Sequence, residues 1–162
     1  MRAQPQSASA AVQGREPLMR VFLVEDNPDH AFLAVTVVRQ VLGDDCEVVV
    51  AETTGEALEM ITQFTDQDRP DIFLVDLRLP EGGGFSVLSS IRTNEACGQV
   101  PILVITSSLY DLDIAQSYEL GASAVLTKPL SRGALREELT RIGMIAARPG
   151  GEANKAVRLR GI

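Results

Sequence analysis

Four short apolar runs, each closed by polar residues, constrain the fold of this chain more than any other feature. They occupy residues 21–24, 72–75, 102–105 and 125–126. Near-continuous runs of Val, Ile and Leu are typical of parallel strands that are buried on both faces of a sheet. Stretches with helical spacing lie between the runs, and this alternation predicts repeated strand–helix units and a parallel α/β sheet.

The sequence predicts one folded body over residues 18–147, in which residues 47–51 supply a fifth strand. The predicted helices are 28–42, a helix opened by Thr53 and Thr54, 85–92, 109–120 and a helix capped by Ser131. The triplet Gly82-Gly83-Gly84 is expected to form a flexible turn, because no lysine follows it as in a nucleotide-binding loop. Residues 1–17 are expected to be disordered, and residues 148–162 to form a C-terminal tail or arm.

Length and composition indicate a cytosolic protein with one domain. The chain has 162 residues, of which 45% are hydrophobic and 23% are charged, and this suits one domain of roughly 100 to 150 residues. No run approaches the roughly 18 apolar residues of a membrane span, and the N-terminus lacks the apolar centre of a signal peptide. Cys46 and Cys97 lie far apart in the sequence, so neither a disulfide framework nor a zinc site is expected.

The distribution of charge argues against nucleic acid as a direct partner. The formal net charge is −7, to which residues 1–17 contribute +1 and residues 148–162 contribute +3, so residues 18–147 carry −11. The phosphate backbone of a nucleic acid repels such an acidic body.

The residues that close the apolar runs have complementary chemistry. Glu25 and Asp26 follow the first run, Asp76 and Thr106 follow the next two, and Lys128 follows the last. The carboxyl ends of parallel strands gather along one edge of the sheet, where open α/β sheets bind their ligands. Carboxylates about 4 Å apart repel each other by about 4 kcal/mol near a protein surface. A bound divalent cation is therefore expected, with Mg²⁺ favoured and Mn²⁺ tolerated.

Such an edge can support phosphoryl transfer. A metal-bound carboxylate that faces a phosphoryl donor can act as the nucleophile and form an acyl phosphate. Thr106 could hydrogen-bond an oxygen of the transferred group, and Lys128 could neutralise its charge. Each residue alone has a simpler explanation, such as a solvated turn for an acidic pair. Four complementary strand ends are harder to explain by chance, and Lys128 is the single lysine among residues 18–147, beside eight arginines.

Four segments resemble the receiver domains of two-component response regulators. They are Val24-Glu25-Asp26-Asn27, residues 71–80, Ile105-Thr106-Ser107-Ser108 and residues 121–129, which follow the order and spacing of the family. The resemblance implies a flavodoxin-like, doubly wound five-stranded parallel sheet of order 2-1-3-4-5 with five helices. It also implies that Asp76 accepts a phosphoryl group from a histidine kinase or a histidine phosphotransfer protein.

The resemblance further assigns roles within the site. Asp26 and Asp76 would bind Mg²⁺ directly, Glu25 would act through water, and the backbone carbonyl of Arg78 would complete the protein ligands. Thr106 would move to the phosphoryl group, and Lys128 would pair with it. Arg78 and Ser108 resemble positions that tune the lifetime of the phosphate in the family.

Val125 departs from the family pattern, which has an aromatic residue three positions before the lysine. The signal is therefore expected to travel through backbone and loop shifts.

A stand-alone response regulator is expected, because no DNA-binding or enzymatic segment follows the body. Residues 107–122 are similar to the phytochrome-associated subgroup, some members of which dimerise through C-terminal arms. A bacteriophytochrome kinase and a homodimer formed through residues 148–162 are therefore candidate interactions.

Three alternative functions fit the sequence less well. A magnesium-dependent phosphatase of the haloacid-dehalogenase-like class needs a second Asp two residues after the nucleophile, where this chain has Arg78. A flavin carrier needs hydroxyls and amides where Glu25 and Asp26 stand. A receiver without phosphorylation would lack a site residue, and none is missing. His30 is expected to be an exposed helix residue, because the strand patterns oppose the helical bundle of a phosphohistidine carrier.

Overall fold

A computed structural model describes residues 18–108 and 110–147 of the chain. Five parallel strands form one sheet in the order β2-β1-β3-β4-β5. The strands are β1 (Arg20–Val24), β2 (Glu47–Ala51), β3 (Ile72–Asp76), β4 (Ile102–Thr106) and β5 (Ala124–Thr127). The predicted fold class and strand order are confirmed, and the expected tails at 1–17 and 148–162 lie outside the described residues.

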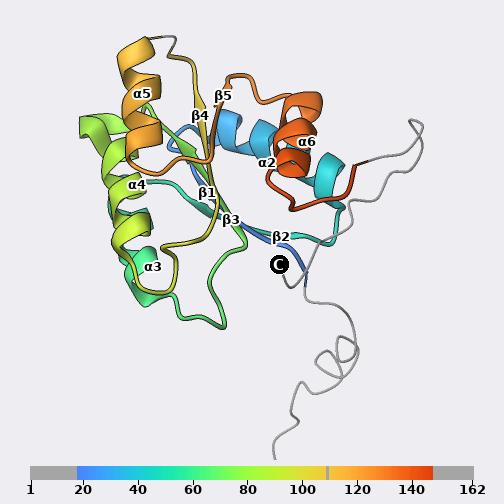
Figure 1. Ribbon diagram of the computed structural model, residues 1–162, viewed down its shortest axis with the longest axis horizontal. Coiled ribbons are helices and arrows are strands. Elements are labelled where there is room, and N and C mark those ends of the chain that lie inside the picture. The colour runs from blue at the N-terminus through green and yellow to red at the C-terminus, as the bar shows by residue number, and fades with distance from the viewer. Residues whose placement is uncertain (1–17, 109, 148–162) are drawn as a thin grey trace, which may run out of the picture.

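Helices cover both faces of the sheet (Figure 1). They are α2 (Pro28–Leu42), α3 (Thr54–Gln63), α4 (Gly83–Thr93), α5 (Asp111–Glu119) and α6 (Arg132–Arg141), with a short 3₁₀ turn, η1 (Pro80–Gly82). Helices α2 and α6 lie on one face, and α3, α4 and α5 lie on the other. Within the described ranges, none of these helices has both the length and the apolar character required to cross a bilayer.

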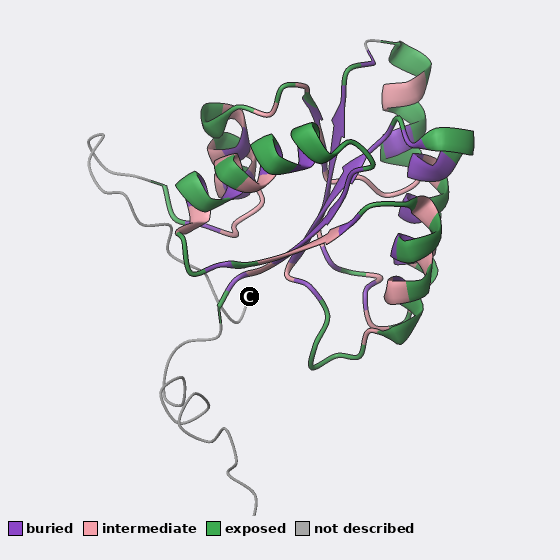
Figure 2. Cartoon of the chain, turned by 180° about the vertical axis from the view of Figure 1, so that it is seen from behind, coloured by how far each residue is buried: buried purple, intermediate pink, exposed green. Residues whose placement is uncertain are grey.

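The side chains of each strand alternate between two hydrophobic clusters. Val21 and Leu23 of β1 pack under α2 and α6, whereas Phe22 and Val24 pack under α3 and α4. Every residue of β3 and β4 is buried, as the colours of the central strands in Figure 2 show. Because both faces of the sheet are covered, the strands can present polar side chains to solvent only at their ends.

The N-terminal cap of α2 fixes the position of the residues that follow β1. The side chain of Asn27 accepts hydrogen bonds from the backbone N–H groups of Asp29 and His30, and Pro28 occupies the first turn of α2, as predicted. Thr53 and Ser131 cap α3 and α6 in the same way. Helix α2 therefore starts directly after the acidic pair that follows β1 and holds that pair at the edge of the sheet.

The expectation of a flexible turn at Gly82-Gly83-Gly84 is wrong. Only Gly82, with φ of 71°, lies in the turn, whereas Gly83 and Gly84 are buried in the first turn of α4. A Cβ atom at Gly84 would clash with the backbone of Leu77, and one at Gly83 would clash with the side chain of Thr54. The glycines therefore allow α4 to pack closely against the segment after Asp76. This tertiary packing outweighs the low helix propensity of glycine.

Candidate functional site

Three carboxylates converge at the carboxyl edge of the sheet. Glu25 and Asp26 follow β1, Asp76 ends β3, and β1 and β3 are neighbours in the sheet. One carboxylate oxygen from each residue lies within 4.8 Å of the other two. Glu25 and Asp76 are 4% and 3% exposed, whereas Asp26 is exposed. The structure thus brings the three predicted carboxylates together at a site that opens to solvent beside Asp26.

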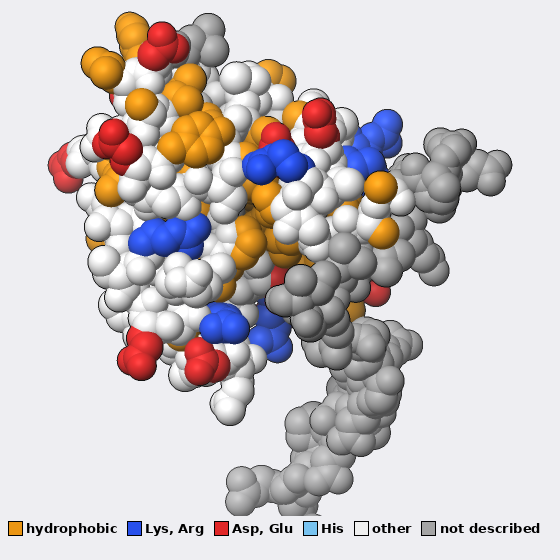
Figure 3. Space-filling view, in the orientation of Figure 1, with side chains coloured by type: hydrophobic (Ala, Val, Ile, Leu, Met, Phe, Trp, Pro, Cys, Tyr) orange, Lys and Arg blue, Asp and Glu red, His pale blue; other side chains and the backbone are white. Residues whose placement is uncertain are grey.

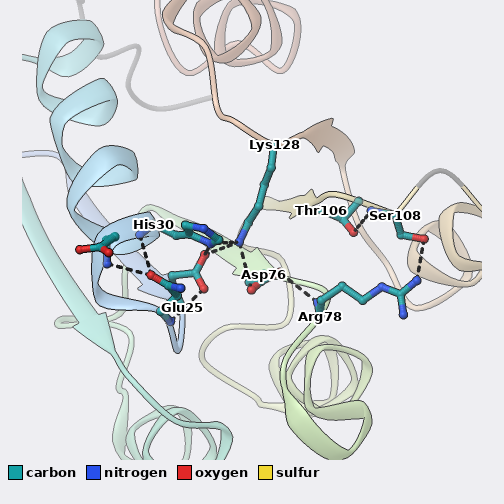
Figure 4. Close-up of polar contacts among 9 residues, drawn as sticks. Glu25, His30, Asp76, Arg78, Thr106, Ser108 and Lys128 are labelled. Carbon is teal, nitrogen blue, oxygen red and sulfur yellow. Dashed lines mark hydrogen bonds and ion pairs between the residues drawn. The ribbon is translucent and has the colours of Figure 1, made fainter.

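The side chain of Lys128 extends toward Glu25 and Asp76 (Figure 4). Its Nζ atom lies 2.5 Å from Glu25 Oε1 and 3.2 Å from Asp76 Oδ2. The backbone N–H of Lys128 donates to the carbonyl of Thr106, which ties the end of β5 to β4. We call Glu25, Asp26, Asp76 and Lys128 the inner cluster.

The electrostatics of the inner cluster leave negative charge in excess. Burial raises the pKa of Glu25 to about 7; the hydrogen bond from Lys128 opposes this rise, and the neighbouring Asp76 adds to it. For Lys128, burial lowers the pKa, but the contacts with Glu25 and Asp76 outweigh burial and raise it. The raised pKa of Glu25 shows that the single ammonium does not fully compensate its buried carboxylate, and a divalent cation would stabilise the ionised form.

Thr106 and Arg78 contact a second group of side chains. Thr106 is buried at the end of β4, and its Oγ1 atom accepts a hydrogen bond of 2.9 Å from the backbone N–H of Ser108. The backbone N–H of Arg78 donates to Asp76 Oδ1 at 2.9 Å. The side chain of Arg78 runs away from Asp76 to Ser108 (Figure 4), and its Nη2 atom lies 3.2 Å from Asp113 Oδ2. We call Arg78, Ser108 and Asp113 the outer cluster.

His30 is closer to the site than the sequence predicted. Its side chain is half exposed, as expected, but its Nδ1 atom lies 3.1 Å from Lys128 Nζ and 3.9 Å from Glu25 Oε1. The expectation that it is only an exposed helix residue is wrong, because the first turn of α2 points back toward the inner cluster. The short spacing after Asp26 is a sequence signal that could have indicated this contact.

The donor set of the inner cluster fits a hard divalent cation. All three candidate ligand side chains are carboxylates, whose oxygens Mg²⁺ prefers, and Mn²⁺ accepts the same donors. The exposure of Asp26 leaves room on that side for water and for an incoming phosphoryl group.

The family model of the response regulator receiver domain matches residues 21–140. The chain therefore belongs to the response regulator receiver family. Among curated relatives, it is 30% identical over 129 residues to the DNA-binding regulator RpaA of Synechocystis sp., a match that spans 80% of this chain but only 49% of RpaA. It is 31% identical over 111 residues to the response regulator Rcp1 of the same organism, covering 67% of this chain and 75% of Rcp1.

Solved structures extend this comparison. The bacteriophytochrome response regulator AtBRR is 29% identical, with a TM-score of 0.68 and coverage of 83% of this chain and 99% of AtBRR. The phosphorylated cyanobacterial phytochrome response regulator RcpA is 29% identical, with a TM-score of 0.64 and coverage of 78% and 91%. The Mn²⁺-bound form of Rcp1 is 28% identical, with a TM-score of 0.61 and coverage of 76% and 91%. The predicted likeness to phytochrome-associated response regulators is confirmed.

Proposed function

We propose that Asp76 accepts a phosphoryl group from the phosphohistidine of a histidine kinase or a histidine phosphotransfer protein. The observation that supports this most is the convergence of two further carboxylates and one ammonium on Asp76. The carboxylate of Asp76 is held at both oxygens, by the Arg78 N–H at Oδ1 and by Lys128 at Oδ2. A carboxylate fixed in this way is oriented for attack before the donor arrives.

The transfer needs few groups from the protein. A carboxylate oxygen of Asp76 forms a bond to phosphorus, the phosphorus–nitrogen bond of the donor breaks, and the imidazole nitrogen keeps the electron pair and takes up a proton. Lys128 stabilises the charge that develops on the phosphoryl oxygens. The hydroxyl of Thr106 donates a hydrogen bond to one of these oxygens once it turns away from Ser108.

The cation that we propose is Mg²⁺, with Mn²⁺ as a substitute. Asp26 and Asp76 would hold it directly, Glu25 through water, and the backbone carbonyl of Arg78 would complete the protein ligands. When bound, the cation neutralises charge on the phosphoryl group. The Mn²⁺-bound form of the similar Rcp1 supports this assignment.

The phosphatase alternative has no support in the comparisons or in the site. Arg78 stands where that class requires a second Asp, and its guanidinium contacts Ser108 and Asp113. The protein then carries out only its own phosphorylation and dephosphorylation.

Location and partners follow from similarity and charge. The proposed location is the cytoplasm, and the similarity of the receiver to phytochrome response regulators favours a bacteriophytochrome as the kinase. Its acidic body disfavours nucleic acid and anionic membrane surfaces as direct partners. Residues 148–162, which lie outside the described residues, are proposed as the arm of a homodimer.

The direct test of phosphorylation compares the wild type with Asp76→Asn. With Mg²⁺ and acetyl phosphate, the wild type forms an acyl phosphate that phosphate-affinity electrophoresis detects, and Asp76→Asn forms none. EDTA abolishes the signal of the wild type. Asp111→Asn, which removes an exposed acid from α5, serves as the matched control and behaves like the wild type. Equal labelling of wild type and Asp76→Asn would contradict the proposed acceptor.

A further inference from the structure

The hydroxyl of Ser108 is the centre of the outer cluster. It donates to Asp113 Oδ2 at 2.8 Å and accepts from Arg78 Nη2 at 3.1 Å and from the backbone N–H of Tyr110 at 3.3 Å. A serine hydroxyl has one donor and two acceptor positions, so all three are used. Ser108 therefore cannot move without losing contacts to α5 and to the segment after β3.

Two backbone hydrogen bonds connect the outer cluster to the proposed phosphorylation site. The backbone N–H of Ser108 donates to Thr106 Oγ1, and the backbone N–H of Arg78 donates to Asp76 Oδ1. If the Thr106 hydroxyl turns toward a phosphoryl group on Asp76, it either breaks its bond to Ser108 or pulls Ser108 with it. Movement at the site is thus coupled to the contacts of the Ser108 side chain.

We propose that Asp113 is a positioning residue that holds the resting state of this receiver through Ser108 and Arg78, and that phosphorylation of Asp76 opens the outer cluster. This inference rests on the proposed function. Opening the cluster frees the first turn of α5 and so carries the signal from Asp76 to that helix.

Charge explains why phosphorylation favours the open state. In the resting state the guanidinium of Arg78 faces one carboxylate, Asp113. A phosphoryl group on Asp76 adds a second anion, with a charge of about −1.5 to −2 and strong acceptor oxygens, next to the backbone of Arg78. Arginine pairs with phosphate at least as well as with carboxylate, so the new anion competes with Asp113 for the guanidinium.

The presence of Val125 also favours transmission of the signal through α5. Val125 packs in the cluster under α3 and α4 and has neither an aromatic ring nor a hydroxyl to follow Thr106. By contrast, the guanidinium of Arg78 lies 5.9 Å from the centre of the Tyr110 ring. Tyr110 and Leu112 are largely exposed beside the outer cluster, and hydrophobic side chains gather over the α5 region in Figure 3. Release of Arg78 changes the surroundings of this surface.

Tyrosine fluorescence reports this change directly. The chain has no tryptophan, and its two tyrosines are Tyr110 and Tyr118, both at α5. Addition of beryllofluoride, which mimics a phosphoryl group on a carboxylate, in the presence of Mg²⁺ changes the fluorescence of the wild type. Tyr118→Phe retains the change, because Tyr110 is the tyrosine next to Arg78.

The decisive variants are Asp113→Asn and its matched control Asp111→Asn, which removes the same charge from the same turn of α5. Loss of one partly exposed ion pair shifts a two-state equilibrium by about fivefold. Asp113→Asn therefore needs about one fifth of the beryllofluoride for a half-maximal change, provided that the resting state dominates in the wild type. Ser108→Ala shifts the midpoint in the same direction, and Asp111→Asn leaves it unchanged.

The outcomes separate this inference from the proposed function. A wild type that neither forms an acyl phosphate nor binds beryllofluoride would overturn the proposed function itself. A wild type that is phosphorylated normally, while Asp113→Asn and Asp111→Asn share one midpoint, would overturn the role of Asp113 alone. General damage to the fold would weaken binding of beryllofluoride, whereas the proposal requires tighter binding.

Discussion

The inner and outer clusters each pair one cation with acid, three carboxylates in the inner cluster and Asp113 alone in the outer cluster, but they differ in burial. In the inner cluster, the side chain of Lys128 is 16% exposed and the side chains of its two carboxylate partners are each 4% exposed. In the outer cluster, Arg78 is 52% exposed and Asp113 is 27% exposed. The inner contacts lie within the sheet edge itself, whereas the outer contacts join two loops and a helix end.

This difference in burial separates two tasks. Largely buried charges interact strongly and are costly to leave unpaired, so Glu25 and Asp76 hold the Lys128 ammonium in a fixed position. Exposed ion pairs contribute little net stability, so the outer cluster can exchange partners at small cost. The buried cluster is suited to chemistry, and the exposed cluster is suited to switching.

Exchanging the two cations tests this comparison with the largest expected effect. Lys128→Arg should lower the rate of acyl phosphate formation by about 100-fold, because a planar guanidinium cannot replace a compact ammonium between two buried carboxylates. The measurement is the initial rate with acetyl phosphate and Mg²⁺. Arg78→Lys in the outer cluster is the matched exchange and should change this rate by no more than about threefold. Equal losses in the two variants would remove the distinction between the clusters.

Removing one carboxylate of the inner cluster should have a smaller effect, which weakens Mg²⁺ binding but stabilises the metal-free protein. Asp26→Asn should weaken Mg²⁺ binding by at least about tenfold, because a ligand charge is lost. It should also raise the melting temperature of the metal-free protein by roughly 3 °C at low salt, because repulsion among the three carboxylates falls. Calorimetric titration and thermal unfolding in EDTA measure the two effects. Asp113→Asn in the outer cluster should leave Mg²⁺ affinity unchanged.

The smallest expected effect is on the pH dependence of stability. The pKa of Glu25 rises from 4.5 in the unfolded chain to about 7 in the folded protein. The folded state therefore binds the proton more tightly, and this contribution to stability is present at low pH and is lost as the pH rises through about 7. In EDTA, the melting temperature should fall between pH 6 and pH 8, and Glu25→Gln should flatten that fall. An unchanged slope in Glu25→Gln would assign the pH dependence to other groups.

The inner cluster could be predicted from the sequence because it follows from strand ends. Glu25 and Asp76 come directly after apolar runs, Lys128 follows one residue later than its run ends, and parallel pairing brings these positions to one edge of the sheet. The cap of α2 followed from an equally local pattern, whereas the strand order came from the resemblance to receiver domains. The contact of His30 with Lys128 was missed because it depends on how the first turn of α2 faces β5.

The sequence by itself determined the parallel α/β sheet and the identity of the polar residues at its edge, because burial on both faces forces continuous apolar runs and leaves polar groups only at their ends. Only the tertiary structure decided the close packing of Gly83 and Gly84 and the meeting of Arg78, Ser108 and Asp113. Those contacts depend on the positions of α4 and α5 against the sheet. Many weak packing interactions set these positions together, and no short stretch of sequence encodes them.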